Sequence, residues 1–178
     1  MEALRTTANL INQMNAGLAR AIRWLCLIMV VVTLLVVVLR YGFDVGAIAL
    51  QESVMYMHGL VFLLGIPYGI AQNTHVRVDI VHGRLSERWR HRIELAGHTL
   101  FLLPVAGFIF VISLPYVAAS WRVLEGSPEV GGIPAVFLLK SLVPIMAALL
   151  FLQGISQISR IALKTGRDEE PLMSGNAK

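Results

Sequence analysis

The sequence predicts an all-α integral membrane protein, a bundle of four tilted transmembrane helices preceded by an amphipathic N-terminal lead-in. Hydrophobic residues make up 56% of the 178 residues and charged residues only 15%, whereas soluble domains carry about 25% charged residues. The apolar residues are gathered into long blocks, and most positive charges lie on one side of those blocks. These three features together indicate a multi-pass membrane protein.

Each of the four apolar blocks is close to the roughly 20 residues that a helix needs to cross a bilayer. The predicted spans are residues 22–39, 52–71, 93–119 and 135–158. The third would be about 40 Å long as a helix, so it must tilt or project beyond the lipid. The predicted organisation is a cytoplasmic lead-in at 1–21, a transmembrane domain at 22–158 and a polar cytoplasmic tail at 159–178.

The lead-in is predicted to be helical and to run toward the first span. Its apolar residues recur at helical spacing, at Leu10, Ile11, Met14, Leu18, Ile22 and Leu25. This segment lies in the inner membrane interface or extends the first span. The apolar run from Trp24 to Leu39 is broken only by Thr33, and it exceeds the core of a signal peptide, about 7–15 residues. We therefore interpret it as an uncleaved anchor.

The distribution of positive charge predicts the orientation of the bundle. Twelve of the 15 Lys and Arg residues fall in the N-terminal segment, the connection between the second and third spans, and the C-terminal tail. Only Arg40, Arg122 and Lys140 lie toward the other side. Because cytoplasmic segments carry the excess of Lys and Arg, both termini are predicted to be cytoplasmic.

Two ionisable residues fall within the predicted outer halves of the spans, and such residues are functional candidates by default. Glu52 opens the second span, and Lys140 lies one to two turns into the fourth. They can pair with each other, within this chain or across to a partner. Alternatively, Glu52 is interfacial and the Lys140 side chain extends outward to the lipid headgroups.

Other classes of protein fit the sequence less well. His58 and His98 would have to lie at one depth to hold a haem iron, but the spans place them more than about 10 Å apart in height. A small antiporter would need a carboxylate deep in its first span, and residues 22–39 contain none. The basic connection needs no nucleic-acid partner, because anionic membrane lipid explains its arginines. We predict no catalytic, metal, cofactor or substrate site in this chain.

The order of the polar residues resembles the small membrane subunit of tripartite ATP-independent periplasmic (TRAP) transporters, over roughly residues 10–160. The matching pieces are Arg40-Tyr41-Gly42-Phe43, Gln51-Glu52, Tyr56-Met57-His58, His75-Val76-Arg77-Val78-Asp79-Ile80, Lys140, Pro144 and Gln153-Gly154. The Gln-Glu and Tyr-Met-His version is similar to the branch labelled mannitol/chloroaromatic. No single piece is diagnostic, but their order and spacing across four spans are specific.

The resemblance implies a subunit of an importer in the bacterial inner membrane. In that family a periplasmic binding protein delivers an organic acid or related solute, and a large permease subunit carries the solute and sodium ions. The small subunit packs against the stationary part of the large one. Sodium ions are expected to bind the large subunit, because that subunit carries them. Candidate interface or structural residues are Arg40, Glu52, His58, Gly65, Gly69, His75, Arg77, Asp79, Lys140 and Gln153. The rival hypotheses are a self-sufficient small transporter and a haem-binding cytochrome subunit.

The predicted orientation can be tested by labelling single cysteines in a Cys26→Ser background. A cysteine introduced by Gly83→Cys should be protected from an impermeant thiol reagent in intact cells, because the connection that contains it is predicted to be cytoplasmic. A cysteine introduced by Pro128→Cys, in the outer connection, should react and serves as the control. Labelling of the cysteine at position 83 from outside would show that the predicted orientation is wrong.

Overall fold

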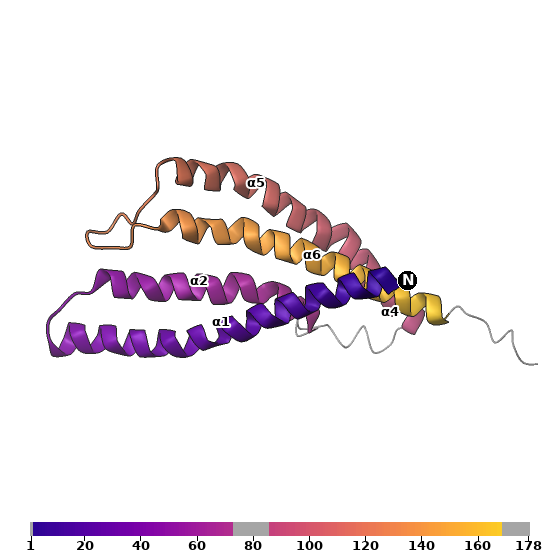
Figure 1. Cartoon of the computed structure of the whole chain (residues 1–178), viewed down its shortest axis with the longest axis horizontal. Helices are drawn as coiled ribbons and strands as arrows, with labels where there is room; N and C mark the ends of the chain where they lie inside the picture. Colours follow the sequence, from indigo (N-terminus) through magenta and orange to yellow (C-terminus); the bar gives the residue numbers. More distant parts are fainter. Residues whose placement is uncertain (1, 73–85, 169–178) are drawn as a thin grey trace, which may run out of the picture.

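The computed structural model describes residues 2–72 and 86–168, and every regular element within these ranges is a helix. Four helical segments are long and apolar enough to cross a membrane, which confirms the predicted all-α, four-span architecture. These segments are Thr6–Gly42, Ile48–Ala71, Trp89–Arg122 and Val136–Ile161. Figure 1 shows two neighbouring pairs of helices, α1 with α2 and α5 with α6.

The first helix, α1, is continuous over Glu2–Gly42. Its 41 residues correspond to about 60 Å, so the lead-in is the first part of the same helix and extends the first span. Ile11 and Ile22 are buried as the apolar spacing predicts, but Leu10 and Met14 are 66% and 46% exposed. The buried face passes instead through Ala8, Ile11 and Asn15, because α6 contacts α1 there.

The second helix, α2, covers Ile48–Ala71 and packs along α1. A short connection joins the two helices at the end of the bundle away from the N terminus (Figure 1). Asp44 has a positive φ of 59°, and the chain turns there so that the Val45 N–H donates to the Leu39 carbonyl at 2.9 Å. Pro67 lies inside α2 and is buried.

The third span consists of three helical segments in succession, α4 (Glu87–Ala96), the π-helical η1 (Gly97–Leu102) and α5 (Leu103–Arg122). It is therefore longer than the predicted 93–119 at both ends. In η1 the Leu103 N–H donates to the carbonyl of His98, five residues earlier. Pro104 follows and has no N–H to donate. The wider π-helical turn before Pro104 gives the neighbouring backbone groups other hydrogen-bond partners.

The fourth span is part of α6, which covers Val136–Asp168 and extends beyond the predicted boundary at 158. This helix contacts all the other helical segments. Its buried residues recur every three or four positions, as expected of a helix that faces the core. They are Pro144, Met146, Ala147, Leu150, Gln153, Gly154, Ser156, Gln157 and Ile161. Thus α6 is the central helix of the fold.

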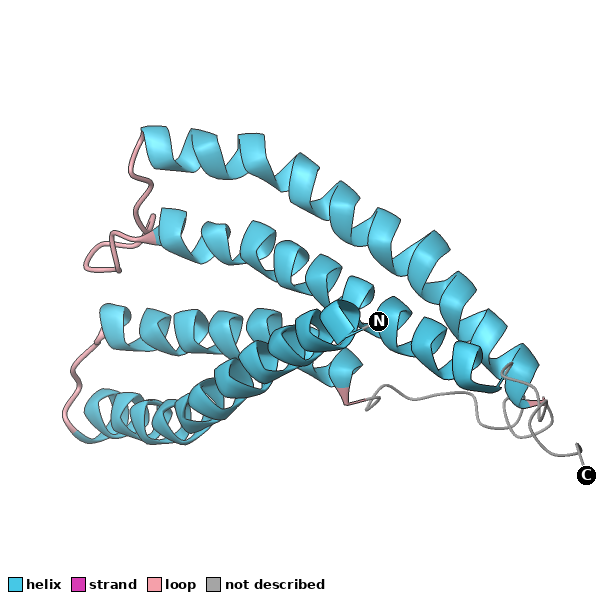
Figure 2. Cartoon of the chain, turned by 45° about the vertical axis from the view of Figure 1, so that its right-hand side comes forward, coloured by secondary structure: helices cyan, strands magenta, loops and turns pink. Residues whose placement is uncertain are grey.

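The two helix pairs converge at the end of the bundle that carries the N terminus and spread apart at the other end (Figures 1 and 2). The central apolar cluster contains Ala106 from α5 with Met146 and Leu150 from α6. Partly buried residues of α2, among them Leu63 and Ile66, pack against this cluster. The apolar core is therefore narrow, and polar contacts join the helices on either side of it.

Candidate functional site

The first polar contact at the spreading end of the bundle is made by Glu52, in the first turns of α2. Its carboxylate accepts hydrogen bonds from the Ser127 hydroxyl and from the Ile133 N–H, the latter at 2.6 Å. Both donors belong to the connection between α5 and α6. A Cβ atom at Gly132 would lie 2.6 Å from the Ser127 Cβ atom and 2.8 Å from the Glu52 Oε1 atom, so glycine there allows the connection to fold closely around Ser127 beside the carboxylate. Glu52 thus joins the two helix pairs.

The second contact at this end is an ion pair between Lys140 of α6 and Glu125 of the same connection, with Nζ 2.5 Å from Oε2. The Ser120 hydroxyl donates to the same carboxylate oxygen at 2.6 Å. The Lys140 ammonium also lies 4.4 Å from the ring centre of Tyr116, within the range of a cation–π contact. Together with Glu52 and Ser127, these residues form what we term the outer cluster.

The Glu52–Lys140 pair considered from the sequence is not formed in the described structure, because each residue has a different partner. Glu125 takes the place of Glu52 beside the lysine, and Glu52 instead binds the backbone and hydroxyl of the connection. The Lys140 hydrogen bond, and then that of Ser120, lower the pKa of the Glu125 carboxyl below the ordinary value of a glutamate. The carboxylate form that pairs with lysine is thereby favoured.

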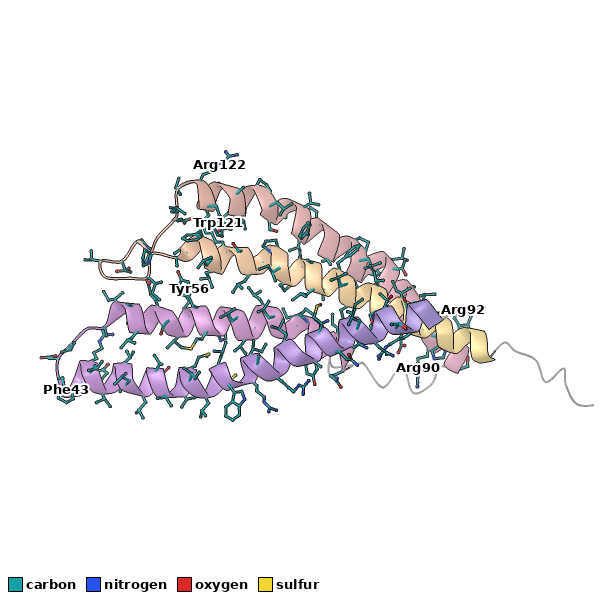
Figure 3. All side chains as sticks on the ribbon, in the orientation of Figure 1. Phe43, Tyr56, Arg90, Arg92, Trp121 and Arg122 are labelled. Carbon is teal, nitrogen blue, oxygen red and sulfur yellow. The ribbon has the colours of Figure 1, made fainter. Side chains whose placement is uncertain are left out.

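Aromatic and hydroxyl groups join α5 to α6 beside the outer cluster. The Trp121 Nε1 atom donates to the Ser141 hydroxyl at 2.8 Å, and the Trp121 ring meets Phe137 edge to face at 4.6 Å between centroids. Figure 3 shows Trp121 at this end of α5, with the neighbouring Arg122 pointing away from the bundle. The ends of the two helices are therefore fixed to each other.

A second set of polar side chains, the inner cluster, lies at the converging end and joins α1 to α6. Gln153 is completely buried and accepts a hydrogen bond from the Asn15 amide at 2.7 Å. Its own amide nitrogen lies 2.9 Å from the Asn12 carboxamide. The Ser156 hydroxyl donates to the Ala8 carbonyl at 3.1 Å. These contacts are made across residues more than 130 positions apart, so they set how α1 lies against α6.

The inner cluster also reaches the end of α2. The Gln157 side-chain amide donates to the Ile70 carbonyl at 3.2 Å and lies 3.5 Å from the Ala71 carbonyl. The last carbonyls of a helix have no partner within it, and Gln157 satisfies them from α6. Arg160, one turn further along α6, donates to the Asn9 side chain at 3.2 Å. The inner cluster therefore connects three helices.

The remaining candidate residues do not gather in one place. Arg40 is exposed at the end of α1. His58 is exposed on α2 and stacks on Phe62, with 6.1 Å between the ring centroids. Gly65 and Gly69 are partly exposed on α2. The last three candidates lie outside the described residues: His75, Arg77 and Asp79.

Some glycines lie where helices of this chain approach one another closely. A Cβ at Gly59 would lie 2.9 Å from Leu139 of α6, and one at Gly154 would lie 2.9 Å from Leu103 of α5. A Cβ at Gly65 would meet Ile22 of α1 at the ordinary distance of 3.9 Å. Gly59 and Gly154 therefore bring helices of the bundle together, whereas Gly65 leaves room beside α1.

Sequence reasoning missed Glu125, Asn15, Ser156 and Gln157. Nothing in its sequence context singles out Glu125, because only the fold brings it beside Lys140. The buried face of α6 could have been predicted from the spacing of Gln153, Ser156 and Gln157. Polar residues three or four apart within an apolar helix indicate a shared buried face. In the described ranges, no three His, Cys, Asp or Glu side chains gather to form a metal site.

Comparison with protein families gives one match. The family model described as "Tripartite ATP-independent periplasmic transporters, DctQ component" matches residues 29–164. No match was found among curated proteins or among solved structures. The matched range begins within α1 and ends within α6, so it covers parts of all four spans.

We expect Gln153→Leu to lower the free energy of unfolding by about 1–3 kcal/mol, because it leaves the buried Asn15 amide without its acceptor. Denaturant unfolding of the purified chain in detergent micelles measures this. The same substitution at Gln51, which is exposed on α2, is the matched control and should change stability by less than about 0.5 kcal/mol.

A second variant separates the polar contact from simple packing. Replacing both partners of a buried hydrogen bond by apolar residues can be nearly neutral, so Asn15→Leu in the Gln153→Leu background should recover part of the lost stability. Equal losses from Gln51→Leu and Gln153→Leu would show that the inner cluster does not stabilise the bundle.

Proposed function

We propose that this chain, which belongs to the DctQ component family of the tripartite ATP-independent periplasmic transporters, is a stationary scaffold for the large permease subunit. The observation that carries the proposal is the family match over residues 29–164. As a member of this family, the chain is a small, multi-pass subunit of the bacterial inner membrane, in a system that also has a large permease and a periplasmic binding protein. The scaffold role itself is inferred from the surface and from the chain's polar residues.

The surface supports a role in contact with another membrane protein. Large apolar side chains are exposed along whole helices, for example Leu34 (63%) on α1 and Phe108 (65%) on α5. Only a narrow apolar core lies between the helices. Lipid can cover such a surface, but in membranes apolar surface alone does not drive helices together. A partner with complementary shape would cover part of it.

The polar residues support a scaffold more than a transport pathway. Transporter sites usually lie near the middle of the bilayer, where broken helices present their backbone to ions and substrates. Here Glu52 and Lys140 bind the outer connection, and Gln153 is occupied between α1 and α6. The described spans remain helical throughout, with η1 as a π-helical segment rather than an interruption. We infer that the solute and sodium ions pass through the large subunit.

The finer properties of the system follow from the family resemblance. We propose sodium-coupled uptake of an organic acid or related solute delivered by the periplasmic binding protein, with no cofactor in this chain. The residues Gln51-Glu52 and Tyr56-Met57-His58 favour the branch labelled mannitol/chloroaromatic. That branch name does not define the solute, because recognition would reside in the other two proteins.

One face of α2 is our candidate for the contact with the large subunit. Its exposed residues follow one helical stripe: Gln51, Met55, His58 and Phe62. His58 lies about 15 Å along α2 from Ile48, so an exposed imidazole at this depth would meet hydrocarbon. Polar side chains inside membranes usually face protein or water rather than lipid. The exposed face of α1 around Leu34 is apolar and suits lipid.

Co-purification and transport measurements test the proposed function. The tagged chain should recover the large permease subunit from membranes, and the two together with the binding protein should support sodium-driven uptake in liposomes. The chain reconstituted alone should give no uptake of the same solute, because it has no pathway of its own. Uptake by the lone chain would instead support a self-sufficient transporter.

The proposed α2 contact predicts that His58→Ala lowers the yield of the co-purified complex several-fold without unfolding the lone chain, because the imidazole would lose a partner in the large subunit. Leu34→Ala, at similar depth on the apolar face of α1, is the matched control and should leave the yield unchanged. Equal yields from both variants and the unaltered chain would exclude His58 from the interface.

A further inference from the structure

Two neighbouring cavities lie along the junction of α1 and α2. The inner one, of about 350 Å³, is lined by Asn9, Asn12 and Gln13 of α1, by Gln72 at the end of α2, and by Arg160 of α6. Its lining is therefore rich in amide groups and contains one permanent positive charge. It borders the inner cluster, because Arg160 contacts both Asn9 and Asn12 there.

The second cavity, of about 320 Å³, lies further along the same two helices. Its lining includes Arg20, Arg23 and Cys26 of α1, with Val61 and Tyr68 of α2. Ile22 and Gly65 complete the apolar part. This cavity combines two arginines with an apolar floor. There is space beside Gly65 that a larger side chain would fill, because an added Cβ would meet its nearest neighbour, Ile22, only at 3.9 Å.

The linings of the two cavities follow one another along the same two helices, and we term the two cavities together the groove. On α1 the lining residues continue at steps of three or four, through positions 9, 12, 16, 19, 23 and 26. On α2 they continue in the opposite direction, through positions 72, 68, 65 and 61. Residues at these spacings lie on one face of a helix. The groove from Asn9 to Cys26 is about 26 Å long, slightly more than one leaflet with its headgroups, which is about 20 Å.

We propose that this groove binds an anionic phospholipid of the cytoplasmic leaflet. Three arginines line it, Arg20, Arg23 and Arg160, and none of the described residues that line either cavity carries a carboxylate. Guanidinium groups bind phosphate through paired, charge-assisted hydrogen bonds, and the amides of Asn9, Gln13 and Gln72 are additional donors. The phosphate lies at Arg20 and Arg23, and the polar headgroup extends toward Arg160 and the amides. An acyl chain follows Ile22, Val61 and Gly65 toward the middle of the bilayer.

Position and polarity favour a phospholipid over a free anion. The arginines lie at the end of the bundle predicted to face the cytoplasm, where anionic lipid headgroups are found. Trp24, which is 60% exposed, and Tyr68 in the groove lie beside them, as aromatic residues commonly do at the membrane interface. A free phosphate would use only the arginines and amides, whereas a phospholipid also covers the apolar floor.

Native mass spectrometry and lipid titration of the purified two-subunit complex test the proposal. Phosphatidylglycerol should bind more tightly than phosphatidylcholine, and inorganic phosphate should not displace it. We expect Arg23→Gln to weaken phosphatidylglycerol binding about tenfold, through the loss of a charge-assisted contact with the phosphate. Arg160→Gln should weaken it by a smaller factor, because it removes a positive charge beside the headgroup. Arg122→Gln removes the same charge at the other end of the bundle and should have no effect.

Further variants keep the result interpretable. Arg160 also contacts the inner cluster, so Arg23→Gln carries the test if Arg160→Gln disturbs folding. Gly65→Leu should weaken the binding of both lipids, because the leucine fills the apolar floor. Gly107→Leu is the matched control and should leave binding unchanged, because Gly107 lies outside the groove and has similar space, with Phe151 at 3.9 Å from an added Cβ. The proposal is overturned if Arg23→Gln leaves phosphatidylglycerol binding unchanged, or if phosphate competes fully. It is also overturned if the lone chain binds the lipid but the complex does not, because the large subunit would then occupy the groove.

Discussion

The arrangement of this bundle depends on the burial of the Gln153 carboxamide between α6 and α1. Between helices in a membrane the hydrophobic effect contributes little, so hydrogen bonds and close packing determine which faces meet. Gln153 is completely buried and holds the Asn15 amide at 2.7 Å. Any rotation of α1 would leave one or both amides buried without partners, at a cost of about 1–3 kcal/mol for each group. The crossing of α1 over α6 is therefore specified by polar groups (Figure 1).

The outer cluster performs the corresponding task at the spreading end, but through the connection between α5 and α6. Glu52 binds this connection from α2, and Lys140 binds it from α6 through Glu125. Between the two clusters, small residues such as Gly59 and Gly154 allow side chains of neighbouring helices to approach closely. A bundle restrained at both ends in this way is consistent with the scaffold role proposed above.

The sequence predicted the parts of this structure that follow from hydropathy and charge alone. The four spans are confirmed because each is a long apolar block, and a helix is the way to satisfy its backbone in lipid. The path of the lead-in was less predictable, because its contact with α6, such as that of the Ser156 hydroxyl with the Ala8 carbonyl, is created only by the tertiary structure. Glu125 could not be paired with Lys140 from the sequence, since the fold of the connection determines which carboxylate reaches the lysine.

Arg160 belongs both to the inner cluster and to the lining of the groove proposed to bind lipid. It contacts Asn9 of α1 and lines the cavity beside Gln72 of α2, so an anion bound to it would lie where three helices meet. A ligand that binds only the folded arrangement stabilises that arrangement by mass action. Because the apolar core is so narrow, the free energy from such a ligand would be a substantial addition to the stability of the bundle. A phospholipid whose headgroup reaches Arg160 would therefore reinforce the same contact between α1 and α6 that Gln153 specifies.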